Sequence, residues 1–215
     1  AVQPDRLIVL ETEGWAALDA ASKSGFETLL EGLQRAGVTL LRRAKHPWLE
    51  TLEQAIGNAG DVCGAITGWE NRWAQRNLVD ENPDGVSARA QATLAKAEAM
   101  SPEDYRTALL EREAAQLCHA KLAPRADAII TLACPGPAPL WPGDVPGQPL
   151  APRPTGNAVF NYPSSMLFAP ALTMPLMSVH GMPVGVQVMG QQHEDARLTA
   201  IARWMLDAVT PVVVS

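Results

Sequence analysis

The sequence has few cysteines, and they are not arranged as ligands or as pairs. Cys63, Cys118 and Cys134 are odd in number and far apart, with no CxxC neighbour and no histidine at metal-ligand spacing. This pattern favours a reducing compartment over a disulfide framework. It also lacks the paired ligands of a structural zinc site. We therefore expect free thiols, no bound metal and a cytoplasmic location.

Long apolar runs and clusters of positive charge are also missing. The longest apolar stretch, residues 126–134, is far shorter than the roughly 20 residues that span a bilayer, and residues 1–10 do not resemble a signal peptide. The 17 Lys and Arg residues are scattered among 23 Asp and Glu, giving a net charge of −6 without the basic runs that bind phosphates. We expect no membrane and no nucleic acid as partners.

What remains is the composition of a folded globular protein. The hydrophobic share is 47% and the charged share 19%, both usual for globular domains. A length of 215 residues suits one domain, spanning residues 1–215, with a sizeable core. The following pattern of strands and helices places this domain in the α/β class.

Residues 1–43 have the pattern of a strand, a helix and a second strand. The run 7–10 is apolar, and a helical pattern follows over about 15–36, with Phe26, Leu29 and Leu33 on one face. Glycine at position 37 ends the helix, and residues 38–41 form another apolar run. We expect a βαβ unit, and therefore the start of a parallel sheet.

Residues 47–122 are expected to be helical. Helical spacing covers about 47–77, residues 80–85 have the composition of a turn, and a helix follows over 87–100. Ser101 and Pro102 then open a helix that continues to about residue 122. The first segment contains four glycines, each of which costs about 1 kcal/mol inside a helix. We expect them to allow close packing against another backbone; they are Gly57, Gly60, Gly64 and Gly68.

Residues 128–215 should contain strands, a proline-rich loop and a final helix. Residues 128–132 are expected to form a buried strand, and eight prolines between positions 135 and 154 exclude regular structure there. The runs 172–176 and 184–189 predict two neighbouring strands. Glu194 and Asp195 lie in the first turn of the closing helix, and its apolar stripe includes Leu198 and Met205.

Two segments of this last region resemble the amidase signature family. Residues 127–139 read DAIITLACPGPAP, and residues 155–190 read TGNAVFNYPSSMLFAPALTMPLMSVHGMPVGVQVMG. The resemblance covers nearly all of this chain but only the C-terminal half of the family's domain. The second segment is the specific one, and its matching residues are Gly156, Asn157, Phe160, Asn161, Pro163, Pro170, Ala171, Pro175, Gly181, Pro183, Val184, Gly185, Gln187 and Gly190.

The resemblance implies part of a mixed β-sheet covered by helices, and hydrolysis of the C–N bond of small carboxylic amides without a cofactor. In the family a serine nucleophile, a serine in a cis peptide and a lysine base perform this reaction, and all three lie in the other half of the domain. No lysine here has a matching context, so we expect no catalytic residue in this chain and no activity of the chain alone. The expected substrate-binding residues, which would form one wall of a substrate tunnel, are Thr155, Gly156, Asn157, Phe160 and Asn161.

Departures from the family pattern bear on the substrate. Relatives that act on glutaminyl-tRNA carry an acid where this chain has Ala158, which disfavours glutamine amidotransfer. Phe168 stands where the family commonly has glycine, and Cys134 replaces a more polar residue. Both substitutions predict a narrower and more apolar pocket, suited to a hydrophobic acyl or aryl amide.

Other possible catalytic groups have simpler explanations. Ser164 and Ser165 lack the nearby glycines that would hold an oxyanion, and Cys118 and His119 are helix neighbours that do not share a face. The acids between positions 80 and 84 fit a turn better than a calcium loop. The predicted site therefore contains no nucleophile of its own.

Four interpretations of the chain remain open at this stage. It is a fragment of a complete amidase, a separately encoded subunit that completes a site with a partner, an inactive remnant that acts as a binding or scaffold protein, or a hydrolase with an unrelated site. Half of a mixed sheet would expose a strand edge and an apolar surface. We expect the chain to pair with the missing half or with a second copy of itself.

Overall fold

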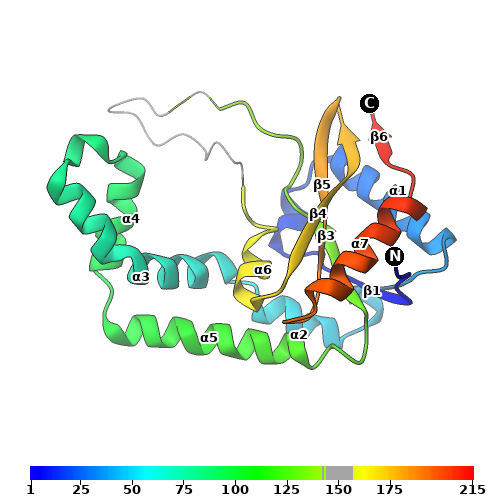
Figure 1. Cartoon of the computed structure of the whole chain (residues 1–215), viewed down its shortest axis with the longest axis horizontal. Coiled ribbons are helices and arrows are strands. Elements are labelled where there is room, and N and C mark those ends of the chain that lie inside the picture. The colour runs from blue at the N-terminus through cyan, green and yellow to red at the C-terminus, as the bar shows by residue number, and fades with distance from the viewer. Residues whose placement is uncertain (142, 144–156) are drawn as a thin grey trace.

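Short runs of branched apolar residues form one six-stranded mixed sheet (Figure 1). The structure is a computed structural model, and it describes residues 1–141, 143 and 157–215. The expected α/β class is confirmed. The strands are β1 (Arg6–Val9), β2 (Thr39–Leu41), β3 (Ala128–Leu132), β4 (Ala171–Val179), β5 (Met182–Met189) and β6 (Val212–Val214).

The strand order is β2-β1-β3-β5-β4-β6. β1 pairs in parallel with both β2 and β3, as the βαβ pattern predicts. β3 and β4 each pair antiparallel with β5, and β4 and β5 form the predicted pair of neighbouring strands. β6, which sequence reasoning missed, lies parallel to β4. Both edge strands, β2 and β6, are only three residues long, so each open edge offers few unpaired backbone groups.

Capping side chains set the start of several helices. Asp19 accepts a hydrogen bond from Ser22 N, so the first α-helix begins at residue 20, and residues 13–17 form a 3₁₀ turn. Ser101 and Asp104 form a reciprocal capping box at the predicted position. No described helix is long and apolar enough to cross a membrane. The helices are α1 (Ala20–Arg35), α2 (Trp48–Ala55), α3 (Ala59–Glu81), α4 (Ala88–Glu98), α5 (Pro102–Ala120), α6 (Tyr162–Leu167) and α7 (Asp195–Ala208).

The two faces of the sheet have separate cores. On one face, α1 and α7 bury Phe26, Leu29 and Met205 against alternate residues of β1, β3, β4 and β5. On the other face, α2, α3, α5 and α6 bury residues such as Leu52 and Ile66. α3 extends past the sheet and packs against α4, so that α3, α4 and the start of α5 form a helical arm (Figure 1).

Buried or half-buried carboxylates hold both ends of β1. At its start, Asp127 Oδ2 accepts hydrogen bonds from the backbone N–H groups of Asp5 and Arg6, and its other oxygen pairs with Arg197. At its end, Glu53 on α2 accepts from Glu11 N at 2.8 Å and from Thr12 N at 2.9 Å. Glu53 is 7% exposed. The chain leaving β1 is therefore fixed to α2.

The glycines of α3 differ in their surroundings. A Cβ atom at Gly60 would lie 3.1 Å from the Tyr162 ring and one at Gly68 would lie 3.4 Å from Ala97 Cβ, which fits the expected close packing. A Cβ at Gly64 would meet nothing within 4 Å, so the expectation is wrong at that position. In β5, by contrast, a Cβ at Gly185 would lie 2.5 Å from Thr173 Cγ2 and 3.1 Å from Ala133 Cβ.

Alanine substitutions at Gly64 and Gly185 should therefore have opposite effects. Gly64→Ala should stabilise the protein by about 0.5–1 kcal/mol, because it removes backbone freedom from a helix interior without a clash. Gly185→Ala should destabilise it by about 1–3 kcal/mol, because the branched Thr173 side chain cannot turn away easily. Urea unfolding of both variants measures the difference, and a stabilising Gly185→Ala would contradict the close contact with Thr173.

Removing the Glu53 carboxylate should destabilise the fold more than removing an exposed one. Glu53→Ala leaves the N–H groups of Glu11 and Thr12 without their partner, which should cost about 2–4 kcal/mol. Glu50→Ala, one turn away on α2, removes an exposed ion pair with Arg43 and an exposed hydrogen bond from Gln54, and should cost about 1 kcal/mol or less. Equal losses for the two variants in urea unfolding would show that the Glu53 bonds contribute little.

Candidate functional site

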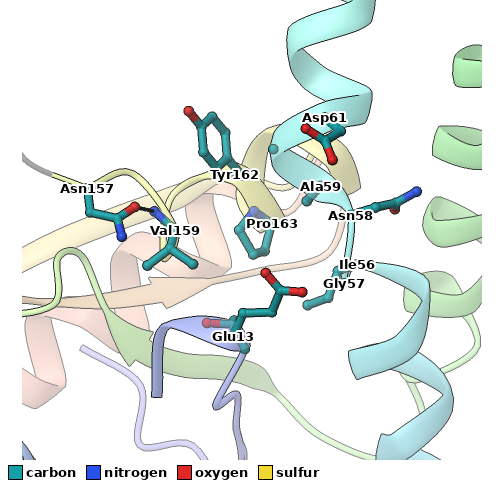
Figure 2. A pocket seen from close by; sticks show the side chains of 12 residues that line it. Glu13, Ile56, Gly57, Asn58, Ala59, Asp61, Asn157, Val159, Tyr162 and Pro163 are labelled. Carbon is teal, nitrogen blue, oxygen red and sulfur yellow. Dashed lines mark hydrogen bonds between the residues drawn. The ribbon is translucent and has the colours of Figure 1, made fainter. Parts of the chain in front are cut away.

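A cavity of about 290 Å³ lies beside the carboxyl end of β1. Three segments that are distant in sequence form it: the turn after β1, the link between α2 and α3, and the chain that leads into α6 (Figure 2). Ligands of α/β proteins commonly bind outside the carboxyl ends of parallel strands. The lining residues are Thr12, Glu13, Ile56, Gly57, Asn58, Ala59, Gly60, Asp61, Asn157, Val159, Tyr162 and Pro163.

Residues 157–163 form one wall, and hydrogen bonds fix its course. Asn157 Oδ1 accepts from Val159 N at 3.1 Å, which shapes the turn (Figure 2). Asn161 Nδ2 donates to the carbonyl of Ala133, just after β3, at 2.9 Å. Asn161 Oδ1 accepts from Gln187 Nε2 of β5 at 3.1 Å. The Asn161 carboxamide thus ties this wall to two strands of the sheet.

The glycine at position 14 allows the turn after β1 to pack directly against the wall at residues 157–163. A Cβ atom at Gly14 would lie 2.7 Å from the Phe160 ring and 2.8 Å from Val159 Cγ1. These distances are too short for any residue other than glycine without movement of the wall. Phe160 itself is fully buried in the sheet core. The turn at residues 12–14 and the wall at 157–163 are consequently packed as one unit.

The start of α3 forms the opposite wall. The Asn58 side chain does not cap its own helix; it points away from the cavity and donates to Glu111 of α5 at 2.6 Å. Gly57 and Gly60 present backbone to the cavity, and Gly60 packs closely against the Tyr162 ring. The positive end of the α3 dipole therefore lies at this wall.

The charged side chains that line the cavity are Glu13 and Asp61, and none of the described lining residues is Lys, Arg or His. Figure 2 shows the two carboxylates on different sides of the space, Glu13 below Pro163 and Asp61 on the first turn of α3. Behind this surface, burial raises the pKa of Glu53 above its ordinary value, against the effect of its two backbone hydrogen bonds.

The five expected substrate-binding residues lie in different situations. Thr155 and Gly156 are outside the described residues. Asn157 lines the cavity. Phe160 lies in the core, and both polar atoms of the Asn161 side chain are occupied by the bonds to Ala133 and Gln187. Neither Phe160 nor Asn161 lines the cavity.

Sequence reasoning missed the other two walls. Glu13 follows a parallel strand, and the position of β1 in the sheet could have drawn attention to it. The glycines at 57 and 60 were noticed, but their meeting with Tyr162 depends on the tertiary fold.

Phe168 does not line this cavity, so the expected narrowing of a substrate pocket by its ring stays a prediction. Phe168 has a positive φ of 53°, a conformation that glycine adopts more easily, and the residue is 68% exposed. It lines a separate hollow with Ser164, Ser165 and His193, on the other side of α6. Cys134 packs against the core of the sheet and does not line the cavity. The structure therefore gives no support for a preference for apolar amides from these two residues.

The other candidate groups have no catalytic arrangement within the described residues. Ser164 Oγ donates to the carbonyl of Asn161 at 2.8 Å, as a helix hydroxyl commonly does. Burial raises the pKa of the Cys118 thiol and lowers the pKa of the adjacent His119 to about 4. The two residues therefore do not form an activated thiolate–imidazolium pair at neutral pH. The described part of the chain contains no group of His, Cys, Asp and Glu residues that could hold a metal ion.

Comparisons with known proteins agree with this architecture. The Amidase family model matches residues 4–199. A solved amidase is 25% identical, with a TM-score of 0.80 over 97% of this chain and 46% of its own length. A 6-aminohexanoate cyclic dimer hydrolase in complex with substrate is 15% identical, with a TM-score of 0.69 over 97% of this chain and 47% of its own. No curated protein matched in a sequence search.

A third similar structure is one component of the glutamyl-tRNA(Gln) amidotransferase from Thermotoga maritima, which is 19% identical with a TM-score of 0.56 over 94% of this chain and 42% of its own length. The chain thus spans a little under half the length of these three solved structures. Because the family model covers most of the sequence and the mixed sheet agrees with these folds, the chain belongs to the amidase family.

Proposed function

We propose that this chain is the C-terminal portion of an amide hydrolase and forms one wall of its substrate cavity. The observation that carries the proposal is the cavity at the end of β1, which is lined by Asn157 and its neighbours, the segment with the most specific match to the family. Backbone and amide groups at its surface suit the carboxamide of a substrate.

The catalytic groups are proposed to lie outside this chain. The serine pair and the lysine that the family uses have no matching positions here, and the hydroxyl and thiol groups near α6 and in α5 have structural partners or raised pKa values. A second segment, on the same polypeptide or on a partner, would bring the nucleophile to the open side of the cavity. The lengths of the similar structures support this division.

The amide substrate is proposed to be small. A volume of about 290 Å³ lies at the lower end of the range for small-molecule sites. Glutamine amidotransfer is not proposed, although one similar structure belongs to an amidotransferase, because Ala158 stands where relatives of that kind have an acid. A partner, either the missing half of the domain or a second copy of the chain, is part of the proposal, because the chain spans less than half the length of the similar structures.

The proposal predicts that the chain binds simple amides without hydrolysing them. Residues 1–215 should release no ammonia from hexanamide or benzamide. Hexanamide at concentrations in the range of about 1–10 mM, typical of weak single-site binding, should slow amide hydrogen exchange at residues 12–14, 57–61 and 157–163. Asn157→Ala should weaken binding about fivefold, the value of roughly one hydrogen bond.

Asn71→Ala provides the matched control, because Asn71 is exposed on α3 and does not line the cavity. Turnover by residues 1–215 would show that catalytic groups are present in this chain after all. Protection confined to other regions, or an equal effect of the two asparagine variants, would remove the cavity as the binding site.

A further inference from the structure

The two carboxylates that face the cavity, those of Glu13 and Asp61, differ from several other acids of the chain because no ion pair is recorded for them among the described residues. Several acids are neutralised by arginine, including Glu27 by Arg42 and Glu98 by Arg76. For Glu13 and Asp61, the structure records no ion pair and no hydrogen bond to the side chain within the described residues. Among the residues that the structure describes, no cation pairs with these two carboxylates.

The N-terminus of α3 contributes positive charge to the same cavity and so opposes the two carboxylates. It lines the cavity and carries the equivalent of about half a positive charge. Two full negative charges exceed this contribution. Glu53 and Glu11, beside the turn at residues 12–13, interact electrostatically with Arg43 and therefore add little to the charge of the cavity. Over the described residues that line the cavity, the net charge is thus negative.

A substrate that covers these carboxylates must replace the water that solvates them. An ionised group that loses water without gaining a partner of opposite charge is strongly unfavourable. An ammonium group on the substrate would supply that partner, whereas a carboxylate on the substrate would add like-charge repulsion. A neutral amide lies between these two cases.

We propose that this cavity selects amides that carry a positively charged amino group, with Glu13 and Asp61 as the residues that determine this specificity. The inference rests on the proposed function and adds the class of substrate to it. It replaces the apolar acyl or aryl amide expected from Phe168 and Cys134, neither of which lines the cavity.

Three amides of equal chain length test the proposal: pentanamide, 5-aminopentanamide and glutaramic acid, which end in a methyl, an ammonium and a carboxylate group. Their dissociation constants are measured at pH 7 and low salt by titrating the ¹⁵N-labelled chain and following the backbone signals of Gly57 and Gly60. We expect 5-aminopentanamide to bind at least about tenfold more tightly than glutaramic acid, with pentanamide between them. Each of the two carboxylates attracts the ammonium and repels the carboxylate of the ligand, which is worth about threefold at an exposed site.

Glu13→Gln and Asp61→Asn should each reduce this ratio by about threefold or more, and the double variant should bring it close to one. Asp207→Asn is the matched control, because Asp207 is an exposed acid on α7 at the other face of the sheet; it should leave the ratio unchanged. Added salt of about 0.5 M should also reduce the ratio, because it screens exposed charges.

Equal dissociation constants for the three amides would overturn the charge preference and leave the amide cavity in place. A ratio that Asp207→Asn lowers as much as Glu13→Gln would show a general effect of net charge and would also overturn it. If none of the three amides shifts Gly57 or Gly60 while the spectrum remains that of a folded protein, the proposed function fails together with the inference.

Discussion

The contact between the Glu53 carboxylate and the backbone of residues 11–12 is the constraint on which the rest of the site depends. It fixes the direction of the chain as it leaves the central strand β1. That direction places Glu13 at the cavity and Gly14 against Phe160. Phe160 in turn belongs to the segment that Asn161 ties to β3 and β5. A buried acid on α2 therefore positions a surface that belongs largely to other elements.

The sheet and the helices are the part that could be predicted from the sequence. The strand at 128–132, the strand pair β4–β5 and the apolar stripe of α7 follow from local periodicity, and each was found close to its expected place. The start of α5 was clear because Ser101 supplied a cap that the sequence revealed. β6 was missed because three valines near a chain end carry no periodic signal, and α6 because six residues beginning beside a proline are too few for a helical pattern.

The candidate site could be predicted only in part, because it depends on contacts between distant segments. The resemblance to the amidase family indicated one wall, but similarity of sequence did not separate Asn157, at the cavity, from Phe160, in the core. The side-chain direction of Phe168 follows from its left-handed backbone conformation, which no sequence pattern revealed. The acidic character of the cavity likewise arises only when the fold brings the turn after β1 to the start of α3.

The contact at Gly14 has a consequence for anyone who wishes to reshape this protein. Residue 14 meets the ring of Phe160 and the side chain of Val159 beneath the cavity wall, and of these three residues only Val159 lines the cavity. A larger residue at position 14 combined with a smaller one at position 160 would keep the total packed volume. It would move part of that volume from the wall at 157–163 to the turn at 12–14. Such paired changes offer a route to new ligand shapes that leaves every group on the cavity surface in its original chemical form.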